Sequence, residues 1–298
     1  MAPRRRTSEL TAGERLNFLL TNRIPRRWTT LFVGWLSRRR NPLVRDLSIA
    51  IWQFFAGDLR LEEARKARFN SMHDCFIREL KPGARPVARH PGSIVSPCDG
   101  IVMAGGRMTG NRLIQAKGFP YALAELLGDE ALAAPYQNGT FVTLRLRANM
   151  YHRFHAPDAC HLTTVRYISG DTWNVNPIAV KCVERLYCRN ERAVLPLNVD
   201  GLRLPLLLVP VAAIAVASIR IHGLGESLDL RYRGANELPC RRTFARGEEM
   251  GYFQQGSTMI VVAGRDVQLA NGTSPGTTIR MGRTLLVRSA PRRADIFQ

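Results

Sequence analysis

Several polar side chains in the sequence could act together as a nucleophile, a base and a group that orients the base. The set consists of Asp99, His152, His155 and Ser257, with Gly256 directly before the serine. A glycine has no Cβ, so it can adopt a strained peptide geometry in which the hydroxyl of a following serine approaches the preceding carbonyl. An aspartate, a histidine and a serine brought together can carry out nucleophilic catalysis.

Each of these residues also has an ordinary structural interpretation. Asp99-Gly100 is a common turn sequence, and Gly256-Ser257 before a β-branched run is typical of a turn that leads into a strand. His152 and His155 are three residues apart, so they share one helix face or converge at an irregular corner. A metal site there would need a third ligand, and no Cys, His or carboxylate is spaced to provide one. We therefore predict no bound metal.

The elements that must position these residues follow from the pattern of the sequence. The segment Lys81-Pro82-Gly83-Ala84-Arg85-Pro86 should break a helix, and the pattern before it is helical, including residues 59–80. After it, β-branched runs predict strands at 93–95, 100–103, 140–146, 162–168, 193–197, 211–221 and 257–262, with one helix at 121–127. We expect an α+β protein with a helical region over residues 1–80 and a β-rich, mainly antiparallel catalytic domain over residues 81–298.

The chain is strongly basic, and its charge is concentrated near the N-terminus. Against 24 Asp and Glu there are 43 Lys and Arg, a formal charge of +19. The first 50 residues contain eleven arginines against three acidic residues, a net of +8, and three of the four tryptophans lie within residues 28–52. Arginines beside Trp, Phe and Leu at helical spacing predict an amphipathic region that docks on acidic lipid. One alternative is helices packed on the main domain with solvated arginines, and another is a nucleic-acid surface.

Two further features concern the location of the protein. The apolar runs at 28–36, 47–56 and 204–219 are too short for a transmembrane helix, and the last contains Pro205 and Pro210, so we expect no membrane crossing. The six cysteines include no C-x-x-C pair, which argues against a zinc cage or a disulfide framework and favours a reducing compartment. No compact apolar segment typical of a signal peptide follows the basic N-terminus.

The sequence resembles a known family, the bacterial phosphatidylserine decarboxylases, which are pyruvoyl-dependent and made as self-cleaving proenzymes. The matching segments occur in the family's order between about Phe76 and Val262, and their combination is specific. They are residues 76–86, Ser96-Pro97-Cys98-Asp99-Gly100, 115–118, 138–141, Tyr151-His152-Arg153-Phe154-His155-Ala156-Pro157, 170–171, 175–176, 189–192, 247–251 and Gly256-Ser257-Thr258. One departure is Gln255, where the family pattern has Leu. This side chain supplies no reactive atom, so we expect an altered processing rate and not a loss of cleavage.

The resemblance implies a precursor that cleaves itself between Gly256 and Ser257. Ser257 would attack the Gly256 carbonyl, and elimination with loss of ammonia would leave a covalent pyruvoyl group derived from Ser257. The products would be a large chain, 1–256, and a small chain, 257–298. The same resemblance makes His155 the base that activates Ser257 and Asp99 the group that orients His155. It makes His152 a proton donor or a group that positions the substrate carboxylate.

The implied reaction converts phosphatidylserine to phosphatidylethanolamine and CO₂. The pyruvoyl ketone would form a Schiff base with the substrate amine and act as the electron sink. The implied partners are phosphatidylserine, anionic membrane lipid and a second copy of the chain in a homodimer, and no nucleic acid is expected. The implied location is peripheral, on the cytoplasmic side of the cell membrane.

Three other functions remain open on the sequence alone. A basic membrane-binding protein of the same fold would not process itself, and its chain would stay uncut. A serine hydrolase could use Ser257, His155 and Asp99, but the sequence lacks the G-x-S-x-G turn of one common hydrolase class. A pyruvoyl decarboxylase of another amino-group substrate would share the cleavage without needing the basic amphipathic region.

Overall fold

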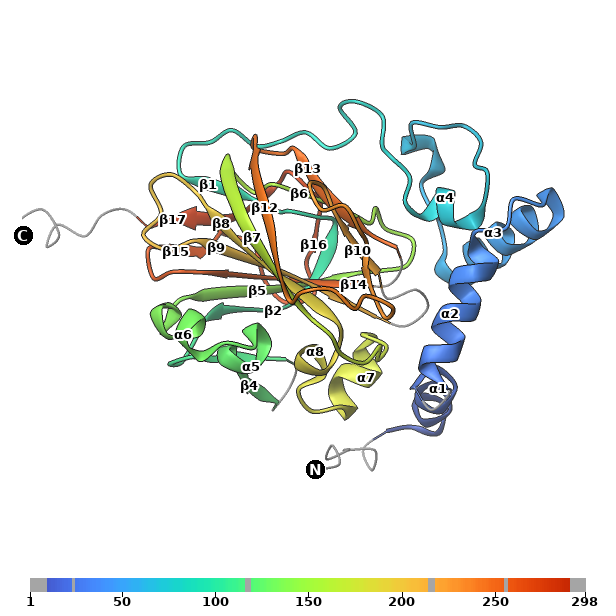
Figure 1. Cartoon of the computed structure of the whole chain (residues 1–298), viewed down its shortest axis with the longest axis horizontal. Helices are drawn as coiled ribbons and strands as arrows, with labels where there is room; N and C mark the ends of the chain where they lie inside the picture. The colour runs from blue at the N-terminus through green and yellow to red at the C-terminus, as the bar shows by residue number, and fades with distance from the viewer. Residues whose placement is uncertain (1–9, 23–24, 116–118, 214–217, 255–256, 290–298) are drawn as a thin grey trace, which may run out of the picture.

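The computed structural model describes residues 10–22, 25–115, 119–213, 218–254 and 257–289, and it confirms the expected β-rich α+β class (Figure 1). The helices are α1 (Ala12–Asn22), α2 (Arg26–Ser37), α3 (Pro42–Ala56), α4 (Met72–Phe76), α5 (Leu123–Leu127), α6 (Glu130–Ala133), α7 (Pro177–Cys182) and α8 (Leu186–Arg189), with 3₁₀ turns at Leu61–Glu63 and Ala134–Tyr136. The three long helices come first in the chain, and the short ones are inserted between strands.

Within the described residues, a large antiparallel sheet of eight strands forms the centre of the molecule. In spatial order its strands are β12 (Glu237–Phe244), β7 (Cys160–Ile168), β8 (Arg192–Asn198), β9 (Leu206–Ala212), β14 (Ser257–Ala263), β5 (Thr140–Leu146), β2 (Gly100–Arg107) and β16 (Thr278–Ile279). The strand that begins at Ser257 therefore lies near the middle of the sheet, between β9 and β5.

Smaller antiparallel sheets complete the β structure. One has the order β11 (Leu228–Asp229), β10 (Ser218–Ile221), β13 (Glu249–Phe253) and β6 (Arg153–His155). Another has the order β1 (Ser93–Val95), β17 (Thr284–Arg288) and β15 (Val267–Leu269), and β3 (Arg112–Ile114) pairs with β4 (Pro120–Ala122). In Figure 1 the sheet with β6, β10 and β13 lies above the large sheet, and helices α5–α8 lie below it.

The large sheet is buried on both faces, which explains the uninterrupted apolar run of β14. Met259 and Val261 belong to the core cluster that includes Phe253 of the smaller sheet. Ile260 belongs to a second cluster that includes Tyr187 of α8. A strand covered on both faces needs apolar side chains at every position, so it shows no alternation of polar and apolar residues.

Helices α1–α3 form an arm along one side of the β body (Figure 1). The start of α3 is capped by the Asn41 side chain, which accepts hydrogen bonds from two backbone N–H groups, and Pro42 occupies its first turn. Trp52 of α3 is buried and packs against Phe76, with 5.4 Å between ring centroids. The expectation that Trp52 contacts lipid alongside Trp28 and Trp35 is therefore wrong for this residue. In the part of the chain described, no helix is both long enough and apolar enough to span a bilayer.

The helix expected over residues 59–80 is absent, and this segment forms a loop that returns on itself. Within it only the 3₁₀ turn Leu61–Glu63 and α4 are helical. The Arg65 N–H donates to the Glu79 carbonyl, and the Lys81 N–H donates to the Glu63 carbonyl. These hydrogen bonds pair backbone N–H and C=O groups across the loop. This long-range pairing replaces the helix that the sequence pattern predicts.

Two other predicted elements differ from the structure. The single strand predicted at 211–221 is two strands in different sheets, because β9 ends at Ala212 and β10 begins at Ser218. Residues 214–217 between them lie outside the described part. The helix predicted at 121–127 begins at Leu123, since Tyr121 belongs to β4. The strands predicted at 93–95 and 140–146 are confirmed with the same bounds.

Candidate active site

Ser257 is the first residue of β14 and lies in register with Leu146 of β5 and Ala212 of β9. Its side chain is completely buried, and its Oγ atom has no hydrogen-bond partner within the described residues. Leaving a buried hydroxyl without a hydrogen bond lowers the stability of the fold by about 1–3 kcal/mol. No hydrogen bond among the described residues would have to break before this oxygen reacts. Gly256, on the other side of the predicted cleavage point, and Gln255 lie outside the described residues.

Asp99 lies in the turn between β1 and β2, where it is paired with an arginine. Arg85 donates to both carboxylate oxygens, with Nε to Oδ1 at 2.9 Å and Nη2 to Oδ2 at 2.7 Å. The two side chains are only 5% and 8% exposed. The backbone N–H of Met281 also donates to Oδ1, at 2.8 Å. Asp99 is thus held in place by two segments that are remote from it in the sequence.

His155, in β6, has hydrogen-bond partners on both ring nitrogens. Nδ1 lies 2.9 Å from the carbonyl oxygen of Gly247, which can only accept, so Nδ1 carries the proton. Nε2 then has a lone pair, which accepts a hydrogen bond from the Tyr151 hydroxyl at 2.9 Å. Gly247 has φ of +79°, a conformation that favours glycine. Burial lowers the pKa of His155, so at neutral pH its imidazole is uncharged and can accept a proton.

His152 is fully buried and is held differently. Its Nδ1 lies 2.8 Å from the Met150 carbonyl, so Nδ1 donates and Nε2 carries a lone pair. Nε2 has no partner in the described part of the chain, and the ring stacks at a tilt on Phe76 with 4.1 Å between centroids. Burial lowers the pKa of His152 to about 3. In this state the ring presents an acceptor and not a proton.

The structure brings the candidate residues to one region without joining them directly. The backbone N–H of His155 donates to the Pro97 carbonyl at 2.7 Å, which ties β6 to the turn that contains Asp99. Asp99 precedes β2, and β5 alone separates β2 from β14, so Asp99 and Ser257 are two strand spacings apart, about 10 Å. Among the described residues, no hydrogen bond links Asp99 to His155 or His155 to Ser257.

Two neighbours of the candidate residues make polar contacts that the sequence pattern does not show. Arg85 belongs to the segment expected to break a helix, and Tyr151 of the Tyr-His-Arg-Phe-His motif is expected to support the site through packing. An arginine and an aspartate fourteen residues apart give no periodic signal, so the sequence could not show that they pair. Tyr151 is only four residues before His155, so its hydroxyl was the partner of His155 that the sequence could have indicated.

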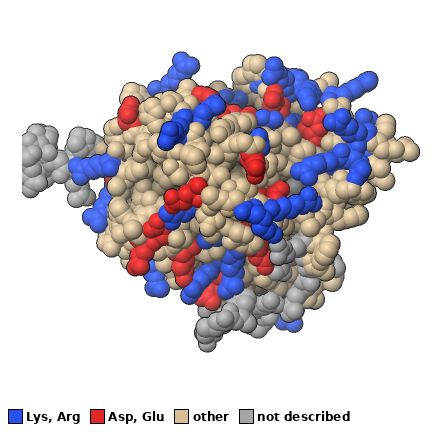
Figure 2. All heavy atoms as spheres, in the orientation of Figure 1, with Lys and Arg blue, Asp and Glu red and all other residues tan. Residues whose placement is uncertain are grey.

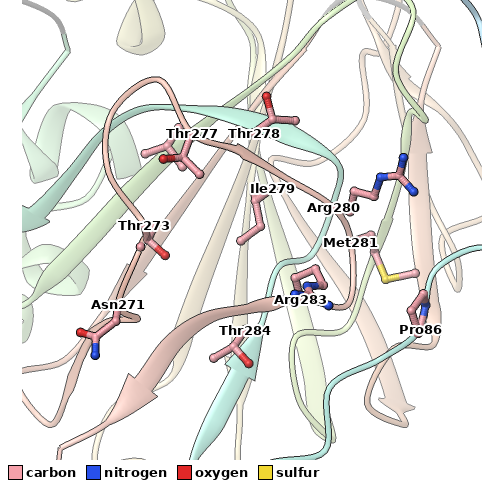
Figure 3. Close-up of a pocket in the computed structure, with 12 residues that line it drawn as sticks. Pro86, Asn271, Thr273, Thr277, Thr278, Ile279, Arg280, Met281, Arg283 and Thr284 are labelled. Carbon is pink, nitrogen blue, oxygen red and sulfur yellow. The ribbon is translucent and has the colours of Figure 1, made fainter.

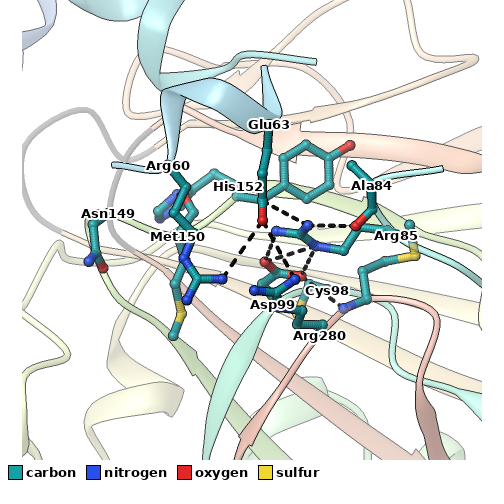
Figure 4. Close-up of polar contacts among 12 residues, drawn as sticks. Arg60, Glu63, Ala84, Arg85, Cys98, Asp99, Asn149, Met150, His152 and Arg280 are labelled. Carbon is teal, nitrogen blue, oxygen red and sulfur yellow. Dashed lines mark hydrogen bonds and ion pairs between the residues drawn. The ribbon is translucent and has the colours of Figure 1, made fainter. Parts of the chain in front are cut away.

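A cavity of about 220 Å³ opens beside Asp99 and Tyr151. Its lining is dominated by charge, and the charged members are Asp58, Arg60, Glu63, Arg78, Arg85, Asp99, Arg147 and Arg280. Glu63 is central to the network drawn in Figure 4, because it approaches Arg85 at 2.8 Å, Arg280 at 3.5 Å and Arg60 at 3.8 Å. The carboxylates of Glu63 and Asp99 are thereby neutralised by arginines.

A second, more open cavity of about 470 Å³ adjoins the first. Figure 3 shows its threonines together with Arg280 and Arg283. It shares Thr278, Ile279 and Arg280 with the smaller cavity, but none of the four predicted site residues lines it. We therefore place the candidate site at the smaller cavity. Within the described ranges, no three His, Cys, Asp or Glu side chains gather as a metal site would require.

Comparisons with known proteins show which family the chain is similar to. The family model described as phosphatidylserine decarboxylase matches residues 72–287. A phosphatidylserine decarboxylase proenzyme of Halorhodospira halophila is 38% identical over 265 residues, which cover 88% of this chain and 86% of the relative. Proteins with the same name from Pseudomonas aeruginosa and Brevibacillus brevis are 36% and 33% identical, over 85% and 78% of this chain and 84% of each relative.

Proposed function

The chain belongs to the phosphatidylserine decarboxylase family, whose members are carboxy-lyases, and on that premise we propose that it cleaves itself between Gly256 and Ser257 and then decarboxylates phosphatidylserine to phosphatidylethanolamine. The observation that carries the proposal is the state of Ser257. A fully buried serine whose Oγ has no partner among the described residues lies at the start of the strand where the family relationship puts the cleavage.

Self-cleavage requires a base for the Ser257 hydroxyl, and His155 is the best candidate. Its Nε2 lone pair would take the Oγ proton, exchanging the Tyr151 hydroxyl for Ser257. Oγ then forms a bond to the Gly256 carbonyl carbon, and the peptide nitrogen of Ser257 leaves as an amine, which gives an ester. Elimination takes a proton from Cα and breaks the Cβ–Oγ bond, releasing the Gly256 carboxylate. Water then replaces the nitrogen at Cα, ammonia leaves and a pyruvoyl group remains.

The enclosed position of Ser257 fits a covalent pyruvoyl group, because a buried carbonyl there is shielded from bulk water. The ketone of such a group would condense with the substrate amine and would serve as the electron sink when CO₂ departs. His152 would act on the substrate through Nε2. A substrate carboxylate beside this nitrogen would favour the charged imidazolium and raise its pKa, so that His152 becomes able to donate a proton.

The two chains produced by cleavage would remain one folded unit. The small chain, residues 257–298, would supply β14 to the middle of the large sheet and β17 to the middle of the sheet with β1 and β15. It would also keep the Met281 N–H on Asp99. Because β14 pairs with strands on both sides, the chains would separate only on unfolding.

Docking on anionic lipid at the cytoplasmic face of the membrane is supported by the surface of α1–α3. Exposed large apolar side chains are concentrated there, and they are Leu16, Leu19, Trp28, Phe32, Trp35, Leu43, Leu47, Ile51, Phe54 and Phe55. Lys and Arg also gather over this side of the molecule, to the right in Figure 2. Apolar side chains beside arginines favour the interface of an acidic bilayer. Arg38, directly after the end of α2, donates to the Gln254 side chain, so the docking surface lies near the proposed cleavage point.

Phe54→Ser together with Phe55→Ser should weaken binding to vesicles that contain phosphatidylserine by about a hundredfold. Both rings are more than four-fifths exposed at the end of α3, and burying each in the interface contributes about 1.5–3 kcal/mol. Vesicle sedimentation at low and high salt measures the effect, and wild-type binding should also fall with salt. Ile114→Ser, at a half-exposed residue of β3, is the control. Equal binding by the double variant and this control would contradict the docking assignment.

The intact mass of the purified protein under denaturing conditions tests the proposed function. Two chains that meet at residues 256 and 257 are expected, and the small chain should be lighter by the elements of ammonia than the same residues with an N-terminal serine. The mature protein should release CO₂ from phosphatidylserine and not from free serine. A single uncut chain in a folded preparation would overturn the proposal in favour of a membrane-binding protein. Release of CO₂ from free serine would favour a pyruvoyl decarboxylase of another substrate.

A further inference from the structure

Two arginines that line the cavity beside Asp99 have no carboxylate partner in the part of the chain that the structure describes. Arg147 follows the end of β5 and makes no side-chain hydrogen bond or ion pair there. Arg78 is 4% exposed, and its Nη atoms donate only to backbone carbonyls, including those of Leu59 and Asn149. Its Nε has no partner. Arg85, in contrast, is fully occupied by Asp99 and Glu63.

A third arginine lies close to Arg147 but does not line the cavity. Arg145, two residues before Arg147 on β5, also has no acidic partner within the described residues. Burial, and next the charge of Arg147, lower the pKa of Arg145. The cavity lining carries five arginines against three carboxylates, so an anion bound there would meet a net positive charge. The cavity is therefore built to receive a negatively charged group.

The position of Arg147 relates this anion site to the reacting residue. Leu146, the residue before Arg147, is the β5 partner of Ser257. One step along a strand and one strand spacing across place the Arg147 Cα about 6 Å from the Ser257 Cα. In phosphatidylserine, only the β-carbon and an ester oxygen separate the reacting α-carbon from phosphorus. A substrate reacting at residue 257 thus has its phosphodiester within reach of the Arg147 side chain.

We propose that this cavity binds the phosphodiester of the substrate headgroup, with Arg147 as its main ligand and Arg78 as a supporting charge. The proposal rests on the function proposed above and assigns the part of the substrate that the chain recognises. A volume of about 220 Å³ is small for a ligand pocket, so it suits a headgroup and leaves the acyl chains outside. Arginine presents paired N–H donors that match phosphate oxygens.

Arg147→Gln tests the assignment through the kinetics of the mature enzyme. The variant should cleave normally, since in the described part of the chain no hydrogen bond or ion pair joins the Arg147 side chain to Asp99, His155 or Ser257. Its KM for phosphatidylserine in mixed micelles should rise about tenfold with kcat nearly unchanged. Arg112→Gln, which removes an exposed arginine from β3, is the matched control. A KM equal to that of the control would overturn the assignment, as would a loss confined to kcat.

A binding measurement separates this proposal from the proposed function. Calorimetry with soluble glycerophosphoserine on Ser257→Ala, which needs no cleavage, should show binding that Arg147→Gln weakens about tenfold in the same background. Inorganic phosphate should bind more weakly, and serine should show no dependence on Arg147. Phosphate binding as tight as that of glycerophosphoserine would overturn the headgroup assignment and indicate a general anion site. Arg147-dependent glycerophosphoserine binding by a wild-type chain that stays uncut would support the site while refuting the self-cleaving enzyme.

Discussion

Ser257→Ala is expected to yield one uncut chain of 298 residues without decarboxylase activity. The variant lacks the only oxygen that can attack the Gly256 carbonyl from residue 257, so neither the ester nor the pyruvoyl group can form. The fold should be retained, because the substitution removes a buried hydroxyl that has no partner among the described residues. Intact mass, CO₂ release and thermal unfolding measure the three expectations.

Ser218→Ala provides a matched control for this variant. Ser218 is 2% exposed, begins a strand, and has an Oγ without a partner in the described part of the chain, as Ser257 does. Its alanine variant should cleave and turn over as the wild type does. Two chains from Ser257→Ala, or one uncut chain from both variants, would contradict the assignment of Ser257 as the nucleophile.

The strands around Ser257 could be predicted because the sequence pattern there is set by burial. Apart from Arg145 and Ser257, residues 140–146 and 257–262 are all β-branched or apolar, and both segments lie inside a sheet that is covered on two faces. The edge strand β12 was not predicted, since Glu237–Phe244 alternates polar and apolar residues imperfectly and contains Pro239. The helix prediction for residues 59–80 was wrong because helical periodicity reports only on local sequence. The backbone of this segment instead pairs across the loop, between residues that are distant along the chain.

The candidate site shows the same division between local and long-range information. The motifs containing Asp99, the two histidines and Ser257 could be found by inspection, and the structure places all of these in one region. Their actual hydrogen-bond partners could not be found in this way. The Gly247 carbonyl, the Met281 N–H and Arg85 reach the site from segments between 14 and 182 residues away in the chain. Only the folded sheet brings them together.

The Asp99–Arg85 pair connects parts of the protein that the proposed cleavage would separate. Arg85 binds Glu63 of the N-terminal region as well as Asp99, and Asp99 accepts from Met281 of the predicted small chain. Arg280 of the same small chain approaches Glu63. A buried pair with these extra contacts holds the cleavage region in register before and after cleavage. Removing one member leaves the other charged and buried, which costs about 3–5 kcal/mol.

Asp99→Asn is therefore expected to lower the free energy of unfolding by about 3 kcal/mol and to slow self-cleavage by about a hundredfold or more. In the proposed mechanism the carboxylate would stabilise the imidazolium that forms when His155 takes the Ser257 proton, and the amide would not. Arg85→Gln breaks the same ion pair from the other side while keeping the carboxylate. It should destabilise the protein by a similar amount and slow cleavage much less. Equal slowing by both variants would show that Asp99 acts only through stability.

The pH profile of cleavage gives a second, independent discrimination between these variants. In the proposed mechanism His155 acts as a neutral base, so the rate should be lost as pH falls through its pKa, which burial holds below its usual range. The charges of Glu249 and Asp99 raise this pKa, and that of Arg153 lowers it. Asp99→Asn should therefore move the acid limb to lower pH, whereas Arg85→Gln, by leaving the Asp99 charge uncompensated, should move it to higher pH. Shifts in the same direction would contradict a direct electrostatic effect of Asp99 on His155.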